Sequence, residues 1–314
     1  PQFDETARFL GEIKERVGRV VVGQEVVVER ILIALLTGGH LLLEGVPGLA
    51  KTLLVAAVSK TVDLDFARIQ FTIDLLPSDI LGSEILDQRD QTFKTHKGPI
   101  FTNLLLADEI NRTPPKTQSA LLEAMQERSV TAAGQNHKLP HPFFVLATQN
   151  PIEQEGTYPL PEAQLDRFMF NIWVDYPEYA DEIEVVKRTT GGASASVNAV
   201  LSANEIAAFQ QHVRKMPVAD NVVEYAVKLA AKTRPGREHA PDQVNQYLSW
   251  GAGPRASQYL IVAAKCHAAF AGKYSPDIEN VRAVALPILR HRIVRNYKAE
   301  AEGITVERLV GELV

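Results

Sequence analysis

A glycine-rich segment directly after an apolar run carries the clearest chemical signal in the sequence. Residues 45–52 read Gly-Val-Pro-Gly-Leu-Ala-Lys-Thr and follow the run Leu-Leu-Leu-Glu at 41–44, which predicts a buried strand, a tight turn and a helix beginning near Lys51. Backbone N–H groups at the start of such a helix face an anion, the lysine reaches the β- and γ-phosphates, and the Thr52 hydroxyl ligates Mg²⁺. The segment therefore predicts a phosphate-binding loop for a nucleoside triphosphate.

The loop departs from the strict pattern at one position. The pattern G-x-x-x-x-G-K-[ST] requires glycine before the lysine, and Ala50 stands there. Alanine fits if its φ is negative, because a Cβ is poorly tolerated at positive φ. The alternative is a glycine-rich turn with a solvent-exposed lysine, and the rest of the chain must decide.

An acidic pair follows a second apolar run. Residues 104–107 read Leu-Leu-Leu-Ala and lead into Asp108 and Glu109, a Walker B pattern at the sheet edge where α/β proteins bind ligands. Asp108 is expected to hold Mg²⁺, directly or through water, and Glu109 to act as general base on the attacking water. Taken alone, the pair also fits a helix cap or a solvated turn.

Three further polar residues fit the same chemistry. Asn150 follows the apolar run 143–148 and could orient the hydrolytic water, although Asn-Pro also starts ordinary turns. Arg167 stands at the entry to a fifth strand. Arg255 lies in the first turn of a helix, an unfavourable place for a cation, which indicates a negatively charged partner; a surface salt bridge would also satisfy it.

The elements that carry these residues alternate between apolar runs and helical patterns up to residue 176. This alternation predicts an α/β domain with a largely parallel sheet, and only helical patterns follow, so a domain boundary is expected near 176. The expected strands are residues 40–44, 66–71, 103–107, 143–148 and 168–174, and the expected helices include residues 53–58, 117–128, 178–190, 203–215, 220–233, 255–271 and 278–297.

The composition excludes several other classes of protein. The 314 residues, 46% hydrophobic and 23% charged, describe a soluble globular protein of about two domains. A net charge of −5 disfavours a nucleic-acid partner. One cysteine, Cys266, permits no internal disulfide, and the eight histidines form no H-E-x-x-H motif. No segment has the apolar length of a membrane span, and a cytoplasmic location is expected.

Taken together, these motifs resemble the AAA+ ATPases, and within them the MoxR family, whose phosphate loop has the same eight residues with alanine before the lysine. The resemblance is dense from residue 21 to Phe168, including residues 104–112, 114–118 and 160–168, and is thinner beyond Tyr176, where it depends mainly on Pro254-Arg255. It implies an AAA+ P-loop core with a mainly parallel five-stranded sheet over residues 1–176, an all-helical lid over 177–314, and ATP and Mg²⁺ as cofactors.

The resemblance also implies roles for particular residues. Asn150 would be sensor 1, Arg255 sensor 2 acting in cis, and Arg167 an arginine finger acting on the nucleotide of the neighbouring subunit in a ring, usually a hexamer. The phosphate-loop residues would bind the nucleotide together with Asp108, and a short segment before the first core helix would flank the adenine. The residues of these two segments are Gly45, Val46, Pro47, Gly48, Leu49, Ala50, Lys51 and Thr52, and Val21, Val22, Gly23 and Gln24.

Two segments resemble insertions of this family. Residues 73–99 resemble the helix-2 insert, and residues 130–141 resemble the pre-sensor-1 hairpin. These segments could move with nucleotide state and touch a substrate. Their composition alone predicts hairpins with polar turns at residues 87–90 and 134–136.

The resulting hypothesis is a ring-forming ATPase that remodels, matures or activates protein partners, such as ones with von Willebrand A domains. Two alternatives stay open. One is a motor that remodels nucleic acid, which the acidic net charge disfavours, and the other is a nucleotide-switched scaffold with little hydrolysis, which the intact set of polar residues disfavours.

Overall fold

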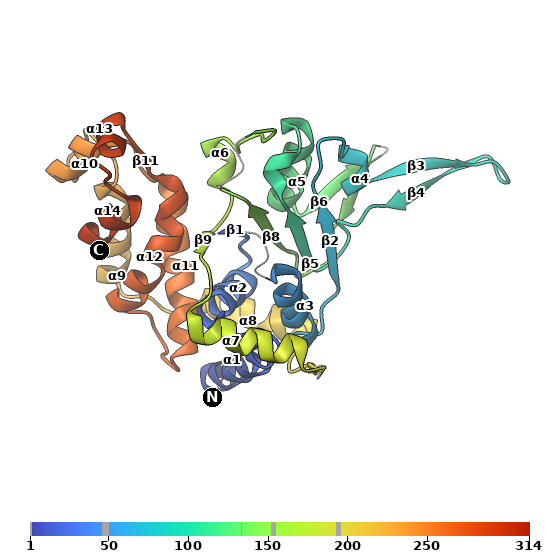
Figure 1. Ribbon diagram of the computed structural model, residues 1–314, viewed down its shortest axis with the longest axis horizontal. Coiled ribbons are helices and arrows are strands. Elements are labelled where there is room, and N and C mark those ends of the chain that lie inside the picture. Colours follow the sequence, from blue (N-terminus) through green and yellow to red (C-terminus); the bar gives the residue numbers. More distant parts are fainter. Residues whose placement is uncertain (1, 46–49, 133, 152–154, 193–195) are drawn as a thin grey trace. The chain divides into compact units, whose positions relative to one another are not determined.

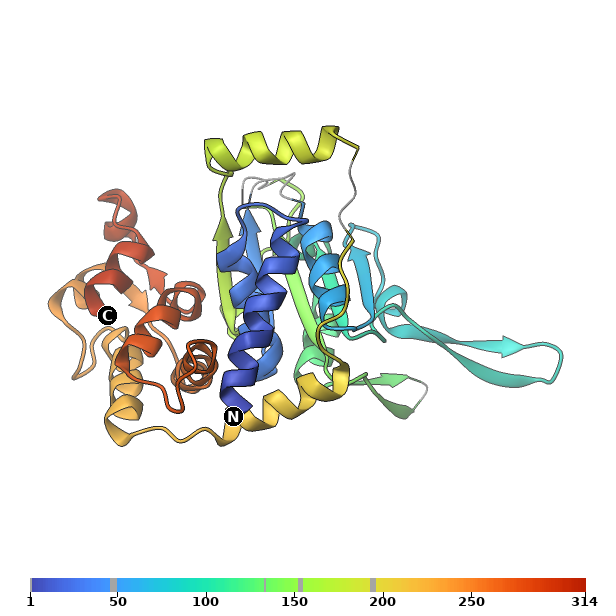
Figure 2. The ribbon, with the colours of Figure 1, turned by 90° about the horizontal axis from the view of Figure 1, so that it is seen from below.

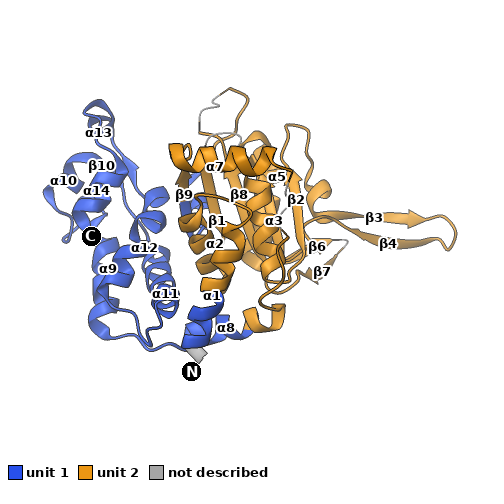
Figure 3. Ribbon diagram, turned by 60° about the horizontal axis from the view of Figure 1, so that its bottom comes forward, with its two compact units in different colours: residues 1–10, 161–171, 208–314 blue, residues 11–160, 172–207 orange. Residues whose placement is uncertain are grey.

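The structure, a computed structural model, describes residues 2–45, 50–132, 134–151, 155–192 and 196–314. The chain forms two compact units (Figure 3), and each is described by itself. The sheet unit comprises residues 11–160 and 172–207, and the helical unit comprises residues 1–10, 161–171 and 208–314. The boundary near residue 176 between a core and a lid domain stays a prediction.

Five strands form the central sheet, in the order β2-β5-β8-β1-β9. The pairs β1–β8, β2–β5 and β5–β8 are parallel, and β1 and β5 are apolar runs whose leucines are fully buried, as strands covered on both faces should be. The predicted strands and the α/β class are confirmed. The strands are β1 (Leu41–Gly45), β2 (Phe66–Gln70), β5 (Leu104–Asp108), β8 (Phe144–Gln149) and β9 (Phe170–Val174).

Helices connect and cover these strands (Figure 1). The helix after the phosphate loop, α3, buries Leu54, Val55 and Val58 and packs against β2 and β5. The helical elements that lie wholly or partly in the sheet unit are α1 (Gln2–Gly18), α2 (Glu25–Thr37), α3 (Lys51–Thr61), α4 (Pro77–Leu81), η1 (Ile110–Arg112), α5 (Pro115–Glu127), α7 (Tyr179–Thr190) and α8 (Ala203–Lys215).

The two predicted hairpins are present. β3 (Gly82–Asp87) pairs with β4 (Thr92–Lys97), and β6 (Ser129–Ala132) pairs with β7 (Gln135–Lys138), both antiparallel. The β3–β4 hairpin extends away from the sheet (Figure 2). Its base requires glycine, because Gly82 has φ 99° and a Cβ there would lie 2.1 Å from the carbonyl oxygen of His96. Substrate contact by these hairpins stays a prediction.

The helical unit is built around α11, whose Leu260, Ala264 and Cys266 are buried. One prediction here is wrong: the helix expected over residues 278–297 ends at Leu289. The chain then forms η2 and a strand, β11, that pairs with β10, a non-local pairing that helical periodicity does not show. The unit contains α6 (Glu162–Leu165), α9 (Asp220–Lys232), α10 (Asp242–Tyr247), β10 (Leu248–Trp250), α11 (Pro254–Phe270), α12 (Ile278–Leu289), η2 (Arg290–Arg292), β11 (Val294–Arg295), α13 (Tyr297–Ala301) and α14 (Val306–Leu313).

Candidate functional site

The phosphate-loop region joins β1 to α3 as the sequence predicts. Gly45 is the buried last residue of β1, and Lys51 and Thr52 are the first two residues of α3. Thr52 is exposed and Lys51 is half-buried, so both side chains lie at the N-terminus of a helix of 11 residues. The predicted loop residues Val46, Pro47, Gly48 and Leu49 lie outside the residues that the structure describes.

Ala50 does not meet the condition of a negative φ under which alanine would fit without strain. Ala50 is the N-cap of α3 and has φ 46° and ψ 34°, in the left-handed region. The chain turns into the helix at this residue, which is why the strict pattern requires glycine. An alanine in this conformation costs about 1–2 kcal/mol, because its Cβ approaches the following carbonyl.

Asp108 ends β5 within a network of hydrogen bonds. Its Oδ1 accepts a hydrogen bond of 2.6 Å from the Thr148 hydroxyl, and its Oδ2 lies 2.8 Å from an Nη2 of Arg68. Thr148, which is fully buried in β8, also accepts a hydrogen bond of 2.9 Å from the backbone N–H of Glu109. One hydroxyl therefore holds both members of the acidic pair.

The electrostatics of Asp108 suit a cation ligand. Partial burial raises the pKa of its carboxyl, but the hydrogen bonds from Thr148 and Arg68 and the charges of Lys51 and Arg68 together hold that pKa below its ordinary value. Asp108 is thus ionised at neutral pH. Lys51 is thus near enough for its charge to lower the pKa of the Asp108 carboxyl.

Glu109 has an unusual backbone and a defined side-chain partner. Its φ is 58° and its ψ is 51°, a strained conformation of the kind that persists at functional sites. Its Oε2 lies 2.7 Å from Nε of Arg112. Both residues line a pocket of about 490 Å³ that also includes Gln70 and Thr72. The carboxylate therefore faces a space that can admit water.

Asn150 follows Gln149, the last residue of β8, and is half-buried. Because β8 pairs with both β1 and β5 in parallel, Asn150 stands at the same edge of the sheet as Lys51 and Asp108. Gly45, Asp108 and Asn150 thus lie at or directly after the ends of β1, β5 and β8. These three strands are neighbours in the sheet (Figure 1).

The segment predicted to flank adenine precedes α2. Val21 is buried, Val22 and Gln24 are half-buried, and Gly23 is exposed with φ 73°. A Cβ at Gly23 would lie 2.6 Å from Oδ2 of Asp181 in α7, so this segment lies directly against α7. Its role in nucleotide binding stays a prediction.

The two predicted arginines lie in the helical unit. Arg255 is in the first turn of α11, and its Nη1 lies 3.3 Å from Oδ2 of Asp166. The salt bridge that the helix-start position allowed is therefore present. Arg167 follows Asp166 in a turn and is half-buried. Among the described residues, its side chain makes no hydrogen bond and no ion pair.

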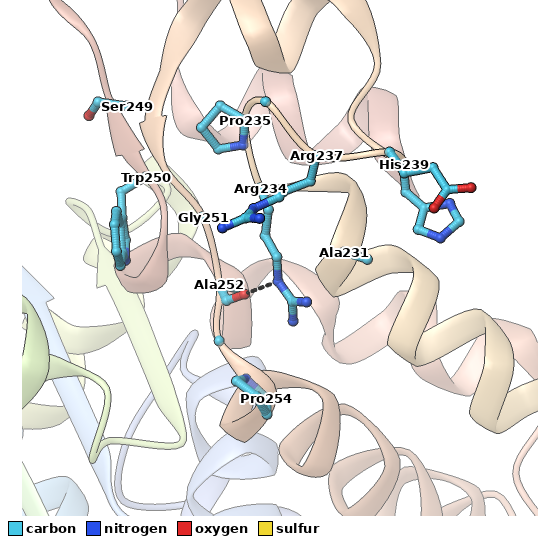
Figure 4. A pocket seen from close by; sticks show the side chains of 13 residues that line it. Ala231, Arg234, Pro235, Arg237, His239, Ser249, Trp250, Gly251, Ala252 and Pro254 are labelled. Carbon is cyan, nitrogen blue, oxygen red and sulfur yellow. Dashed lines mark hydrogen bonds between the residues drawn. The ribbon is translucent and has the colours of Figure 1, made fainter.

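A second pocket, of about 920 Å³, lies in the helical unit beside the loop that leads to Arg255 (Figure 4). Arg234 donates a hydrogen bond of 2.8 Å from Nε to the carbonyl oxygen of Ala252 in that loop. Trp250 borders the pocket and is largely exposed. The hydrogen bond fixes the backbone just before Pro254, the first residue of α11.

The donor set at the sheet edge fits Mg²⁺. Mg²⁺ binds through one or two protein oxygens together with phosphates and water, and the ionised Asp108 carboxylate and the exposed Thr52 hydroxyl supply such oxygens. In the described parts of the chain, no three His, Cys, Asp or Glu side chains cluster as a metal site of their own. Those parts also contain no helix with the length and apolarity that crossing a membrane requires.

Comparison with known proteins defines the class. A family model described as the ATPase family associated with various cellular activities (AAA) matches residues 40–170, and an AAA lid domain model matches residues 242–313. A crystal structure of a protein from Cytophaga hutchinsonii, assigned as an ATPase, is similar with a TM-score of 0.93 and 45% identity. That similarity covers 99% of this chain and 95% of the other. The protein is thus of the AAA class, with its lid.

Two curated relatives narrow the class to a family. Chaperone MoxR1 of Mycobacterium tuberculosis is 44% identical over 307 residues, which cover 98% of this chain and 80% of that protein. Protein MoxR of Methylorubrum extorquens is 30% identical over 308 residues, which cover 92% of this chain and 88% of that protein. The chain belongs to the MoxR family of AAA+ ATPases.

Sequence reasoning missed three residues of the sheet-edge network. Thr148 was part of an expected strand, and nothing in its local pattern marked it as the link between Asp108 and Glu109. Arg112 stands three residues after Glu109, a spacing that could have indicated the ion pair. Arg68 stands in β2, an edge strand of the sheet, where a charged residue within the strand was the available signal.

Proposed function

We propose that this chain hydrolyses ATP at the carboxyl edge of the sheet. The observation that carries the proposal is the Thr148 hydroxyl, which ties the ionised Asp108 to the backbone of Glu109 within reach of the Lys51 charge. Lys51 and the N-terminus of α3 would bind the phosphates. Thr52 and Asp108 would hold Mg²⁺, which neutralises the developing charge on the phosphates.

The remaining residues act on the attacking water. Glu109 faces its pocket from the end of β5, so it would accept the proton of the water as general base. Asn150, at the end of the neighbouring strand, would hold that water in line with the γ-phosphate. Arg112 would orient the Glu109 carboxylate through its ion pair.

The helical unit would supply the positive charge that the transition state needs. Arg255 would act in cis as sensor 2, and Arg167 would act in trans on the neighbouring subunit of a ring, probing its γ-phosphate. The half-buried Arg167, whose side chain has no partner among the described residues, supports this assignment. The proposed assembly is a homo-oligomeric ring, a hexamer in this family's usual form, with ATP and Mg²⁺ as cofactors.

The proposed role of hydrolysis is to remodel, mature or activate protein partners. A relative that is 44% identical carries the name Chaperone MoxR1, which supports a chaperone-like role. The partners we propose are proteins with von Willebrand A domains. The net charge of −5 gives no support to nucleic acid as a partner.

Two substitutions test the hydrolytic site, one through turnover and the other through ATP binding. Glu109→Gln should keep ATP affinity and lower turnover by about 10²-fold or more, because the general base is lost. Lys51→Ala should weaken ATP binding itself, since the lysine contacts the phosphates before the reaction. Glu123→Gln, on the exposed face of α5, is the matched control. Near-normal turnover in Glu109→Gln would overturn the assignment of the base.

The partner is sought with the hydrolysis-deficient protein. Glu109→Gln should retain the ATP-bound state, so a partner that prefers that state should co-purify with the variant in ATP and not in ADP. Purified von Willebrand A domain proteins, added one at a time, give the direct measurement. Equal binding in ATP and ADP would count against a nucleotide-driven partner cycle.

A further inference from the structure

The buried guanidinium of Arg292 is the most completely bonded charge in the helical unit. Its side chain is 2% exposed. Its Nε donates to Oδ1 of Asp166 at 2.8 Å, and its Nη2 donates to the carbonyl oxygens of Asp166 at 2.8 Å and Phe168 at 2.7 Å. Its Nη1 donates to the carbonyl oxygens of Met169 at 3.2 Å and Ile288 at 2.5 Å. All five N–H donors of the guanidinium are thus used.

His291 reinforces the same turn. Its Nε2 lies 2.8 Å from the carbonyl oxygen of Phe168 and 2.9 Å from Nη1 of Arg292. Both N–H groups of Arg292 Nη1 already donate to the carbonyl oxygens of Met169 and Ile288. We therefore assign the His291 tautomer protonated at Nε2, which donates to the Phe168 carbonyl, and the contact with Arg292 is not a hydrogen bond. Phe168 therefore accepts from both His291 and Arg292.

These bonds enclose Arg167. The guanidinium of Arg292 binds backbone oxygens of the residues immediately before and after Arg167, and of Met169 beyond them, while the Arg167 side chain itself stays half-exposed. Four of the five N–H donors thus act on the segment 166–169. A buried arginine used only for packing needs no such concentration on one turn, since any buried carboxylate with other nearby acceptors would satisfy it.

The rest of the environment of Arg292 keeps the guanidinium in place. Its Cζ lies 5.2 Å from the ring centroid of Tyr259 in α11, a cation–π contact. Asp166 also pairs with Arg255, one turn before Tyr259 on the same helix. The turn that carries Arg167 is therefore fastened to η2 and to α11 at once.

We propose that Arg292 is a positioning residue for the arginine finger: it holds the backbone on both sides of Arg167 so that the finger is presented to the nucleotide of the neighbouring subunit. The proposal rests on the proposed ring ATPase. Its specific consequence is a polarity: the defect affects the subunit as donor of the finger and not as holder of its own nucleotide. A subunit with altered Arg292 keeps its own nucleotide site intact and fails only as a donor of the finger.

The test uses Arg292→Lys, because lysine keeps the charge but is a single point donor that cannot bind oxygens on both sides of Arg167. Turnover should fall about 10-fold or more, as part of the roughly 10³-fold that a finger contributes, with the KM for ATP changed less than about threefold. Arg290→Lys, in the same short helix but paired with Glu307, is the matched control and should keep turnover within about twofold.

The ATPase activity of rings that contain two different variants tests this polarity. Arg292→Lys mixed with Lys51→Ala, which has a dead site but an intact finger, should recover activity; mixed with Arg167→Ala, which has an intact site but no finger, it should not. Recovery in the second mixture, or none in the first, overturns the proposal. The Arg167→Ala and Lys51→Ala mixture distinguishes failure of the Arg292 proposal from failure of the proposed function. If this mixture does not recover activity, the proposed trans mechanism itself is overturned.

A second variant covers the case in which Arg292→Lys does not join rings. His291→Phe removes one of the two donors to the Phe168 carbonyl and leaves every Arg292 bond in place. It should show the same polarity in the two mixtures with a smaller loss of turnover, about threefold. The opposite polarity, or unchanged turnover, would overturn the proposal.

Discussion

Two regions of the molecule use the same ion-pair chemistry in opposite ways. At the carboxyl edge of the sheet, Asp108 and Glu109 each pair with an arginine of their own. In the helical unit, one carboxylate, Asp166, pairs with both Arg255 and Arg292. At the sheet edge, arginines thus orient two acidic side chains. In the helical unit, a carboxylate orients two basic side chains.

The difference matches the two kinds of charge that the proposed hydrolysis needs. Hydrolysis of a phosphoanhydride needs carboxylates for the metal and the water, and cations for the charge on the phosphoryl oxygens. Each region pairs its charged side chains locally, Asp108 and Glu109 with arginines of the sheet unit and the two arginines of the helical unit with Asp166. In the proposed reaction, the nucleotide is the group that requires both regions.

The largest effect in this comparison is expected from the helical unit. Arg167→Ala should lower turnover about 10³-fold, equivalent to about 4 kcal/mol, while ATP affinity stays within a few-fold of the wild type. Arg237→Ala, an exposed arginine of the same unit, should leave turnover unchanged. Steady-state phosphate release with separate nucleotide-binding measurements checks both. A normal rate in Arg167→Ala would contradict the claim that the helical unit supplies a cation to the reaction.

A buried histidine makes the stability of the sheet unit depend on pH. His40 precedes β1; its Nδ1 accepts a hydrogen bond of 3.0 Å from the N–H of Val145, and its Nε2 lies 3.3 Å from the carbonyl oxygen of Met125. Burial above all, and also the Arg128 charge, lowers the pKa of His40 from 6.5 to about 4, against the effect of the Met125 bond.

Because the folded pKa lies below the unfolded one, the stability that neutral His40 contributes is complete above pH 6.5 and is lost as pH falls toward 4. Between pH 8 and pH 5 this amounts to about 2 kcal/mol of unfolding free energy. His40→Asn, whose amide oxygen can accept the Val145 bond, should lose that much less on acidification. Urea unfolding followed by Trp173 fluorescence in a Trp250→Phe background measures it; an unchanged pH slope would contradict the assignment.

Removal of the Thr148 hydroxyl, which bonds both Asp108 and Glu109, should have a moderate effect on turnover. Thr148→Val keeps the shape of the side chain but removes the donor to Asp108 and leaves the N–H of Glu109 without its acceptor. We expect turnover to fall about 10-fold, or about 1.4 kcal/mol, from misplacement of the acidic pair. Thr148→Ser keeps the hydroxyl and should recover most of the rate. Equal rates in the valine and serine variants would show that the hydroxyl does not position the pair.

The smallest effect is expected at Ala50. Ala50→Gly removes the left-handed strain of about 1–2 kcal/mol but makes the unfolded chain more flexible, so the net gain in stability should be about 0.5–1 kcal/mol. Ala56→Gly, inside α3, should instead lose about 1 kcal/mol. Thermal or urea unfolding of the two variants compares them directly. A loss of stability in Ala50→Gly as large as in Ala56→Gly would contradict the strain.

The two regions also differ in how far the sequence predicts them. The sheet, the start of α3 and the acidic pair follow from local patterns, because each apolar run is a buried strand and each polar residue comes directly after it. The helix start predicted a charged partner for Arg255 but not Asp166, which lies 89 residues away. The bonds from Arg292 to the turn that carries Arg167 span 123 to 126 residues, and the β10–β11 pair is also non-local. No local period encodes such contacts, and the left-handed φ of Ala50 ran against the residue's own preference.

The most direct test of the central claim, that acidic and basic halves from different subunits form one hydrolytic site, is the specific ATPase activity of the wild type as a function of protein concentration. The mass of the assembly is measured in the same samples by analytical ultracentrifugation. We predict that activity per subunit rises as rings form and levels off when assembly is complete. Full activity per subunit in samples that contain only monomers would contradict the claim.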